Sequence, residues 1–179
     1  MKKTLIALAL VGFVGLAGMV PRASAAAGDT FTFNLAKSDG ATCLSTTSRT
    51  RVTISDLGTV QKMHIEAFGY PANTSFTTFI TQHGTRPFGV SWYQGEIKTD
   101  SRGRGVADFA GIFNDETFVL ADVPVEMDHV GIWFADANDA VKAGCSGIVT
   151  PFDGDHSAGI LVFSSSNFAD DNGPLLHLK

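Results

Sequence analysis

Residues 63–80 read MHIEAFGYPANTSFTTFI and contain the pattern that the rest of the chain repeats. Met63, Ile65 and Ala67 alternate with other residue types, which is the two-residue period of a strand with one apolar face. The sequence Gly-Tyr-Pro-Ala-Asn follows at 69–73 and is rich in turn-forming residues. A second run of Phe, Thr and Ile comes after it, so the stretch predicts a strand, a turn and another strand.

The same period recurs in short runs along the chain, and turn-forming sequences such as Asp-Ser-Arg-Gly at 100–103 separate them. Short strands with regular turns are typical of a sandwich or a barrel. One helical stretch interrupts them between Asp136, which can cap it, and Gly144, which can end it. We therefore predict an all-β fold, a single-domain β-sandwich with one short helix. Beside the strand at 63–68, the expected strands lie at 30–33, 51–55, 76–82, 90–97, 106–113, 117–121, 130–134 and 159–163.

The first 25 residues have the form of a secretory signal peptide. Lys2 and Lys3 precede an uncharged apolar run at 5–20, and Ala23-Ser24-Ala25 supplies small residues for a signal peptidase. The run is shorter than the roughly 20 apolar residues of a membrane-spanning helix. We predict cleavage after Ala25, one mature domain at 26–179, and no membrane span after processing. The expected location is secreted or extracytoplasmic, in the cell wall, the periplasm or the medium.

The charge of the mature chain limits its partners. Three of the 13 basic residues but none of the 18 acidic ones lie in the leader, so the mature chain carries a formal charge of −8. Nucleic acids and anionic membranes are bound by clustered Lys and Arg. The acidic balance therefore argues against either partner and fits a protein outside the cell.

Cys43 and Cys145 are the only cysteines in the sequence. Both lie in the part of the chain that would reach an oxidising compartment, and two thiols allow one intramolecular pairing. A bridge over about 100 residues would restrict the unfolded chain by roughly 4–5 kcal/mol on the chain-entropy model. We predict a disulfide between the first strand region and the last third of the chain. The alternative is a pair of free thiols that bind a metal.

Four blocks of the sequence are distinctive in their spacing, namely Arg86–Glu96 (RPFGVSWYQGE), His129–Phe134 (HVGIWF), Ala143–Cys145 (AGC) and Thr150–Gly159 (TPFDGDHSAG). Together they resemble a family of small exported bacterial β-sandwich proteins to which no activity is assigned. The resemblance covers most of the mature chain and implies export and a sandwich, but no reaction. In related sequences two histidines tend to precede the Trp-Phe pair, whereas Asp128 precedes His129 here. The organisation of residues 63–80 is also similar in style to immunoglobulin-like and fibronectin-like sandwiches, a likeness that implies no function.

Trp92, Tyr93 and Gln94 form the best candidate for a binding surface. An aromatic plane beside an amide suits a sugar ring or another flat ligand, because stacking and paired hydrogen bonds act together. Neighbouring residues of a strand point to opposite faces, so at least one of Trp92 and Tyr93 is expected in the core. Trp133, between two apolar residues, is also expected to be buried.

The densest polar cluster consists of Asp153, Asp155 and His156, which His129 could join in space. Two carboxylates two residues apart can bind a hard cation, and histidine is a common zinc ligand. Asp153, Asp155 and Ser157 match the first three ligand positions of a helix-loop-helix calcium loop, but Ala158 stands where that loop requires a glycine. Calcium or zinc is the cofactor that such a site would take. The alternative is a polar turn whose Asp side chains bind their own backbone amides.

No pattern in the sequence names a reaction, and two hypotheses of different class follow. The first is a non-enzymatic binding or cell-envelope module whose ligand is a glycan, a protein or a small molecule. The second is a metal-dependent enzyme that uses the His and Asp residues named above. Elemental analysis separates them, because the enzyme requires stoichiometric metal.

Export of the full-length chain from a bacterial cell should yield a protein that begins at Ala26. The reason is that the small side chains of Ala23 and Ala25 fit the shallow pockets of signal peptidase. The intact mass of the protein recovered from the extracytoplasmic fraction measures this. Recovery of a chain that still begins at Met1 would contradict the prediction.

Overall fold

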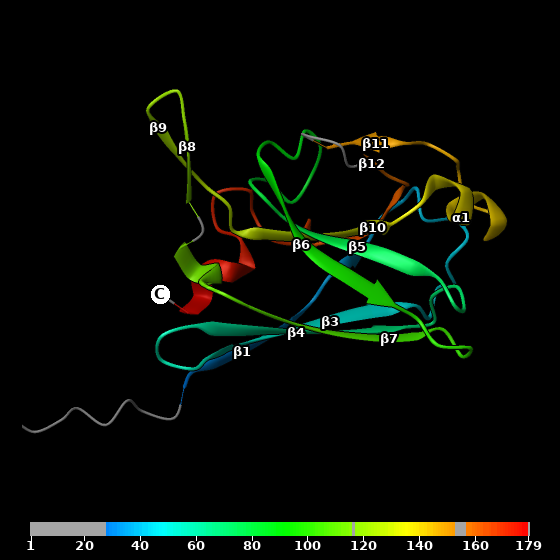
Figure 1. Ribbon diagram of the computed structural model, residues 1–179, viewed down its shortest axis with the longest axis horizontal. Helices are drawn as coiled ribbons and strands as arrows, with labels where there is room; N and C mark the ends of the chain where they lie inside the picture. Colours follow the sequence, from blue (N-terminus) through cyan, green and yellow to red (C-terminus); the bar gives the residue numbers. More distant parts are fainter. Residues whose placement is uncertain (1–27, 116, 153–156, 179) are drawn as a thin grey trace, which may run out of the picture.

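Two antiparallel β-sheets lie face to face in the computed structural model, which describes residues 28–115, 117–152 and 157–178 (Figure 1). The predicted all-β sandwich with one short helix is confirmed, while the predicted leader at 1–25 lies outside the described residues. The four-stranded sheet has the order β1 (Thr30–Asn34), β3 (Arg49–Asp56), β4 (Gln61–Phe68), β7 (Arg104–Gly111). The five-stranded sheet has the order β2 (Ala36–Lys37), β13 (Leu161–Ser164), β10 (His129–Phe134), β5 (Ser75–Thr81), β6 (Ser91–Lys98).

Smaller elements connect the strands of the two sheets. In helix α1 (Ala137–Lys142) the Asp136 side chain accepts the Asn138 N–H at 2.8 Å, and Gly144 follows with a φ of +89°, as the sequence predicts. Among the described residues, no helix has the length and apolar character needed to cross a membrane. The remaining elements are 3₁₀ turn η1 (Phe113–Asp115), the hairpin of β8 (Thr117–Leu120) and β9 (Val123–Glu126), the hairpin of β11 (Thr150–Pro151) and β12 (Ser157–Ala158), and 3₁₀ turn η2 (Pro174–Leu178).

The turn at 69–73 carries the chain from β4 in one sheet to β5 in the other. Gly69 and Asn73 adopt positive φ angles of 71° and 51°, which glycine and asparagine tolerate better than other residues. Between them Tyr70 turns inward, its ring stacks on Phe163 at 5.4 Å, and its hydroxyl hydrogen-bonds the Thr50 hydroxyl at 2.5 Å. The Gly-Tyr-Pro-Ala-Asn sequence therefore makes a corner between sheets.

The main core lies between the facing sides of the two sheets. The alternation seen in the sequence is reproduced, because Met63, Ile65 and Ala67 point inward and are at most 1% exposed. Their polar neighbours, among them His64 and Glu66, form the outer face of the four-stranded sheet. Fully buried partners from the five-stranded sheet are Phe76, Ile80, Ile97, Val130, Ile132 and Phe134.

The five-stranded sheet is also covered on its outer face, by a second apolar group that we call the outer cluster. This explains why all six residues of β10 are buried and why its sequence lacks alternation. At its centre the Trp133 indole lies over Gly131, where an added Cβ would stand 2.4 Å from the ring. The outer cluster consists of buried Phe79, Trp133, Ala158 and Leu161, with half-buried Phe88 and Phe152 packed against them.

The predicted disulfide between Cys43 and Cys145 is confirmed, with the two Cα atoms 4.8 Å apart and a sequence separation of 102. It joins the loop after β2 to Cys145, the third residue beyond the end of helix α1. By the chain-entropy model, closing this loop destabilises the unfolded chain by roughly 4–5 kcal/mol. The bridge therefore holds the β2 edge of the five-stranded sheet close to α1.

Candidate functional site

Trp92 and Tyr93 lie on β6, the strand that ends the five-stranded sheet on one side. They point to opposite faces, since Tyr93 pairs with Phe79 of the outer cluster and Trp92 with Ile80 of the main core. Both are nevertheless substantially exposed, at 47% for Trp92 and 41% for Tyr93. The expectation that at least one would be core is wrong, because an edge strand lacks a neighbouring strand to cover its side chains. The predicted burial of Trp133 is confirmed.

Gln94 occupies a bulge in β6. The pairing with β5 runs from Gly95 opposite Thr78 to Tyr93 opposite Phe79, so Gln94 has no register partner. The next residue, Gly95, has a φ of +150°, and a Cβ there would lie 2.6 Å from the Phe109 ring, so this position requires glycine. A bulge increases the local twist and interrupts the edge of a sheet. Partial burial, followed by the charge of Glu96, raises the pKa of Tyr93, so its hydroxyl stays neutral at ordinary pH.

His129, one of the predicted metal ligands, is fully buried at the start of β10. Its Nδ1 lies 2.8 Å from the Ser165 hydroxyl and its Nε2 lies 3.2 Å from the carbonyl oxygen of Ala169. Because a carbonyl only accepts, we infer that Nε2 carries the proton and that Nδ1 accepts from Ser165. Ser165 in turn accepts the Val130 N–H at 3.0 Å. Both ring nitrogens of His129 are therefore engaged inside the protein.

Asp128 extends this network and is also buried. Its Oδ2 accepts the Gly173 N–H at 2.9 Å, while its Oδ1 lies 3.6 Å from His129 Nε2 and has no hydrogen-bond partner among the described residues. Burial raises the pKa of Asp128, although the Gly173 N–H and the neighbouring His129 act in the opposite direction. The serine, histidine and aspartate are the residue types of a hydrolase, but Ser165 and His129 are fully buried and present no surface to a substrate. The network instead fastens the C-terminal segment to β10.

The other predicted metal ligands, Asp153, Asp155 and His156, lie outside the described residues, so that site stays a prediction. Gly159, which follows β12, donates its N–H to the Phe134 carbonyl at 2.7 Å, at the end of β10 opposite to His129. Within 28–115, 117–152 and 157–178, no group of three or more His, Cys, Asp or Glu side chains is placed to hold a metal ion.

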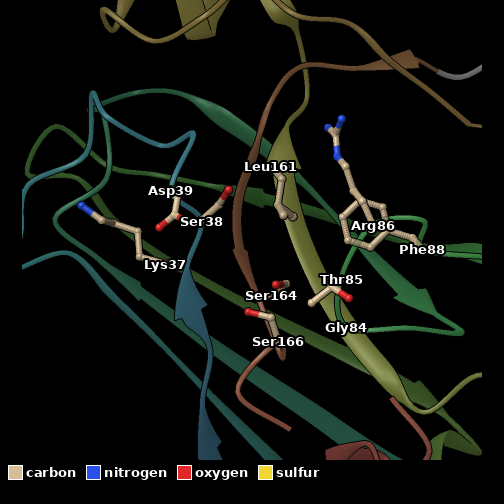
Figure 2. Close-up of a pocket in the computed structure, with 10 residues that line it drawn as sticks. All are labelled: Lys37, Ser38, Asp39, Gly84, Thr85, Arg86, Phe88, Leu161, Ser164 and Ser166. Carbon is tan, nitrogen blue, oxygen red and sulfur yellow. The ribbon is translucent and has the colours of Figure 1, made fainter. Parts of the chain in front are cut away.

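A cavity of about 280 Å³ opens on the outer face of the five-stranded sheet, and we call it the β13 cavity (Figure 2). One wall is the segment Lys37–Asp39, and the opposite wall is the loop of residues 84–88, which contributes Arg86 and Phe88. Leu161 and Ser164 of β13 lie between the walls. Ser166 lines the cavity next to Ser164.

The walls of the β13 cavity are fixed by backbone hydrogen bonds and packing. On one side the Ser38 N–H donates to the Val162 carbonyl at 2.9 Å. On the other, the His83 N–H donates to the Phe88 carbonyl at 3.0 Å, and the Phe88 ring packs edge-on against Trp133 at 5.2 Å. Gly84 lies directly against His129, since a Cβ there would stand 2.8 Å from Nδ1. The outer cluster and the His129 network therefore both position this loop.

Most polar groups of the β13 cavity make no hydrogen bond or ion pair to the described chain. Ser164 is only 3% exposed, yet its hydroxyl makes no hydrogen bond to the described chain. Lys37 differs, because its ammonium donates to the Leu44 carbonyl at 3.2 Å and its side chain points away from the other residues in Figure 2. The groups without a hydrogen bond or ion pair among the described residues are the hydroxyls of Ser38, Thr85, Ser164 and Ser166, the Asp39 carboxylate and the Arg86 guanidinium.

Sequence reasoning did not find this cavity. Arg86 and Phe88 belong to one of the distinctive sequence blocks, but Asp39, Ser164 and Ser166 carry no local signal. They meet only because β2 pairs with β13 and the 84–88 loop folds over the same face.

Comparison with protein-family models, with curated proteins and with solved structures finds no match for this chain. The resemblance to exported β-sandwich proteins therefore stays a prediction. Function has to be inferred from the geometry of the chain itself.

The free energy of unfolding of Asp128→Asn should rise relative to that of the wild type as the pH increases from about 3 to about 7. Burial raises the folded-state pKa of Asp128, so its protonated form is the one that the fold prefers. That contribution to stability is present below the unfolded-state pKa and is lost as the pH rises through the folded-state value. Urea unfolding of both proteins across this range measures the difference.

The matched control is Asp171→Asn, an exposed aspartate in the same C-terminal segment. The free energy of unfolding of this variant should follow that of the wild type at every pH. If the wild type instead gains stability relative to Asp128→Asn as the pH rises, burial does not raise the pKa of Asp128 and the assignment is wrong.

Proposed function

We propose that the mature domain is a non-catalytic binding module that works outside the cytoplasm, with the β13 cavity as the site for a small polar ligand. The location rests on the form of residues 1–25 and agrees with the disulfide, since disulfides persist in oxidising compartments. The rigid two-sheet scaffold places the cavity on loops and strand ends, where binding sites of β-sandwiches commonly lie.

One observation supports the proposal most directly: the unpartnered hydroxyl of Ser164, 3% exposed, between two fixed walls. Buried polar groups are nearly always hydrogen-bonded in native proteins. Ser164 is a largely buried residue whose hydroxyl reaches the cavity and has no partner in the described chain, so this hydroxyl is available to a bound molecule or to water. Because the walls are held by backbone hydrogen bonds, the site is formed before a ligand arrives, which lowers the entropic cost of binding.

The chemistry of the cavity favours binding over catalysis. A general acid or base needs to reach the reacting group, and the described histidine with the most complete network, His129, is enclosed with both nitrogens engaged. The groups that do face the cavity are hydroxyls, one carboxylate and one guanidinium on separate walls, which can orient a ligand by hydrogen bonds.

Trp92 and Tyr93 supply a second contact surface in this proposal. Tyr93 packs against Phe79 at 5.7 Å, so it borders the outer cluster that also supports the wall of the β13 cavity. Exposed aromatic side chains are typical of surfaces that bind glycans or proteins. A larger ligand could thus extend from the cavity toward the β6 edge.

Ser166→Trp should fill the β13 cavity and abolish ligand binding without loss of stability, because Ser166 is exposed and makes no hydrogen bond to the described chain. Binding is measured by backbone amide NMR shifts during titration of the mature protein with a panel of sugars, amino acids, nucleosides, carboxylic acids and inorganic anions. At least one compound should give saturable shifts at 37–39, 84–88 and 161–166.

Ser146→Trp is the matched control, since Ser146 is exposed and does not line the cavity. It should bind as the wild type does. The proposal fails if no compound of the panel shifts the residues of the cavity, or if a compound that shifts them binds Ser166→Trp equally well.

A further inference from the structure

The size of the β13 cavity limits its ligand to a small molecule or to the end of a chain. Ligand pockets usually measure roughly 300–1,000 Å³, and this one, at about 280 Å³, lies just below that range. It is also open on one side, with its walls standing on either side of β13 (Figure 2). A ligand of one or two rings fits this volume, and a longer chain could leave through the open side.

The lining offers many hydrogen bonds of both kinds. A serine or threonine hydroxyl donates one hydrogen bond and accepts others, a carboxylate only accepts, and a guanidinium only donates. The described chain makes no hydrogen bond or ion pair to any of these groups, although the Arg86 guanidinium lies 5.8 Å from the centre of the Phe88 ring. A ligand that satisfies them must itself carry several groups that both donate and accept, and a polyhydroxylated ring has this property.

The charge of the lining selects against ions. Asp39 and Arg86 stand on opposite walls and cancel formally, and the Lys37 ammonium is turned to the Leu44 carbonyl. A free anion would meet the Asp39 carboxylate, and a free cation would meet Arg86. An amino acid could pair with both charges, but its carboxylate and ammonium would then be occupied there, whereas a sugar ring offers several further hydroxyls to the serines and the threonine of the cavity.

An apolar strip completes the site. Leu161 is 8% exposed and Phe88 is half-buried, and both line the cavity beside the polar groups. A sugar ring combines hydroxyls at its rim with apolar C–H faces, so it can cover such a strip while its rim reaches the polar walls.

From these features we infer that the β13 cavity binds a neutral saccharide, either one or two free rings or the end of a glycan, with the ring over Leu161 and the hydroxyls bound by Asp39, Arg86 and Ser164. This inference rests on the proposed binding function of the cavity and names its ligand class.

The test is a titration of the mature, disulfide-bonded protein with neutral mono- and disaccharides, namely glucose, galactose, mannose, N-acetylglucosamine and maltose, followed by amide NMR. Glycine and glutamate serve as zwitterionic and anionic probes, and inorganic phosphate as a simple anion. At least one neutral sugar should give saturable shifts at 37–39, 84–88 and 161–166, and the other probes should not.

Two variants connect the binding to the residues. Asp39→Ala should raise the dissociation constant about tenfold or more, because it removes a charge-assisted hydrogen bond. Ser164→Ala should raise it roughly three- to tenfold. Since neither side chain bonds to the described chain, both variants should fold. Asp171→Ala and Ser146→Ala are the controls, exposed and outside the cavity, and should bind as the wild type does.

The outcomes separate the ligand class from the function. If a non-sugar compound binds in the cavity and no sugar does, the saccharide inference is overturned and the binding function stands. If nothing binds there, both fall. Sugar binding that Asp39→Ala and Ser164→Ala leave unchanged also overturns the inference, because the ligand then lies elsewhere.

Discussion

Packing of the Trp133 indole on the bare backbone of Gly131 is the contact on which the outer half of the molecule depends. In most antiparallel sandwiches one face of each sheet meets water. Here the indole needs the space that a Cβ on Gly131 would take, and in that position its ring meets Phe79 at 5.5 Å, Phe88 at 5.2 Å and Phe152 at 5.2 Å. The outer cluster forms around this one side chain.

The outer cluster also shapes the binding site, because it holds part of the connection between β5 and β6 in place as one wall of the cavity. The segment between β5 and β6 would otherwise be an ordinary surface loop. At its C-terminal end, Phe88 packs against Trp133. At its N-terminal end, Gly84 lies against His129 and donates its N–H to the Asp170 side chain at 3.1 Å. The other wall is held by the Ser38 N–H, which donates to the Val162 carbonyl of β13 at 2.9 Å. Two buried networks of different chemistry thus fix the 84–88 wall, and backbone pairing fixes the other.

Much of the fold could be predicted from the sequence, because these features depend on patterns of residues that are close together in the chain. The alternation of Met63, Ile65 and Ala67 gave the face of β4 that is buried, and Asp136 and Gly144 marked the ends of α1. The disulfide followed from there being only two cysteines. In each case the relevant physics acts between residues close in sequence or leaves a single choice.

The site could not be predicted in the same way, because it depends on which strands are neighbours. The exposure of Trp92 and Tyr93 depends on β6 being an edge strand, and a sequence does not show which strand ends a sheet. The β13 cavity combines Asp39, Arg86 and Ser164 from three distant segments, and isolated serines carry no pattern. His129 appeared as a metal ligand because histidine is a common one, whereas its hydrogen bonds to Ser165 and Ala169 give it a structural role.

Gly131→Ala, studied by hydrogen exchange and chemical unfolding, tests the central claim most directly. The added methyl group should displace the Trp133 indole, lower the free energy of unfolding by roughly 1–3 kcal/mol, and speed amide exchange in the 84–88 loop more than in the four-stranded sheet. If the variant unfolds at the same denaturant concentration and the 84–88 loop exchanges as in the wild type, the outer cluster does not hold the wall of the cavity and the account is wrong.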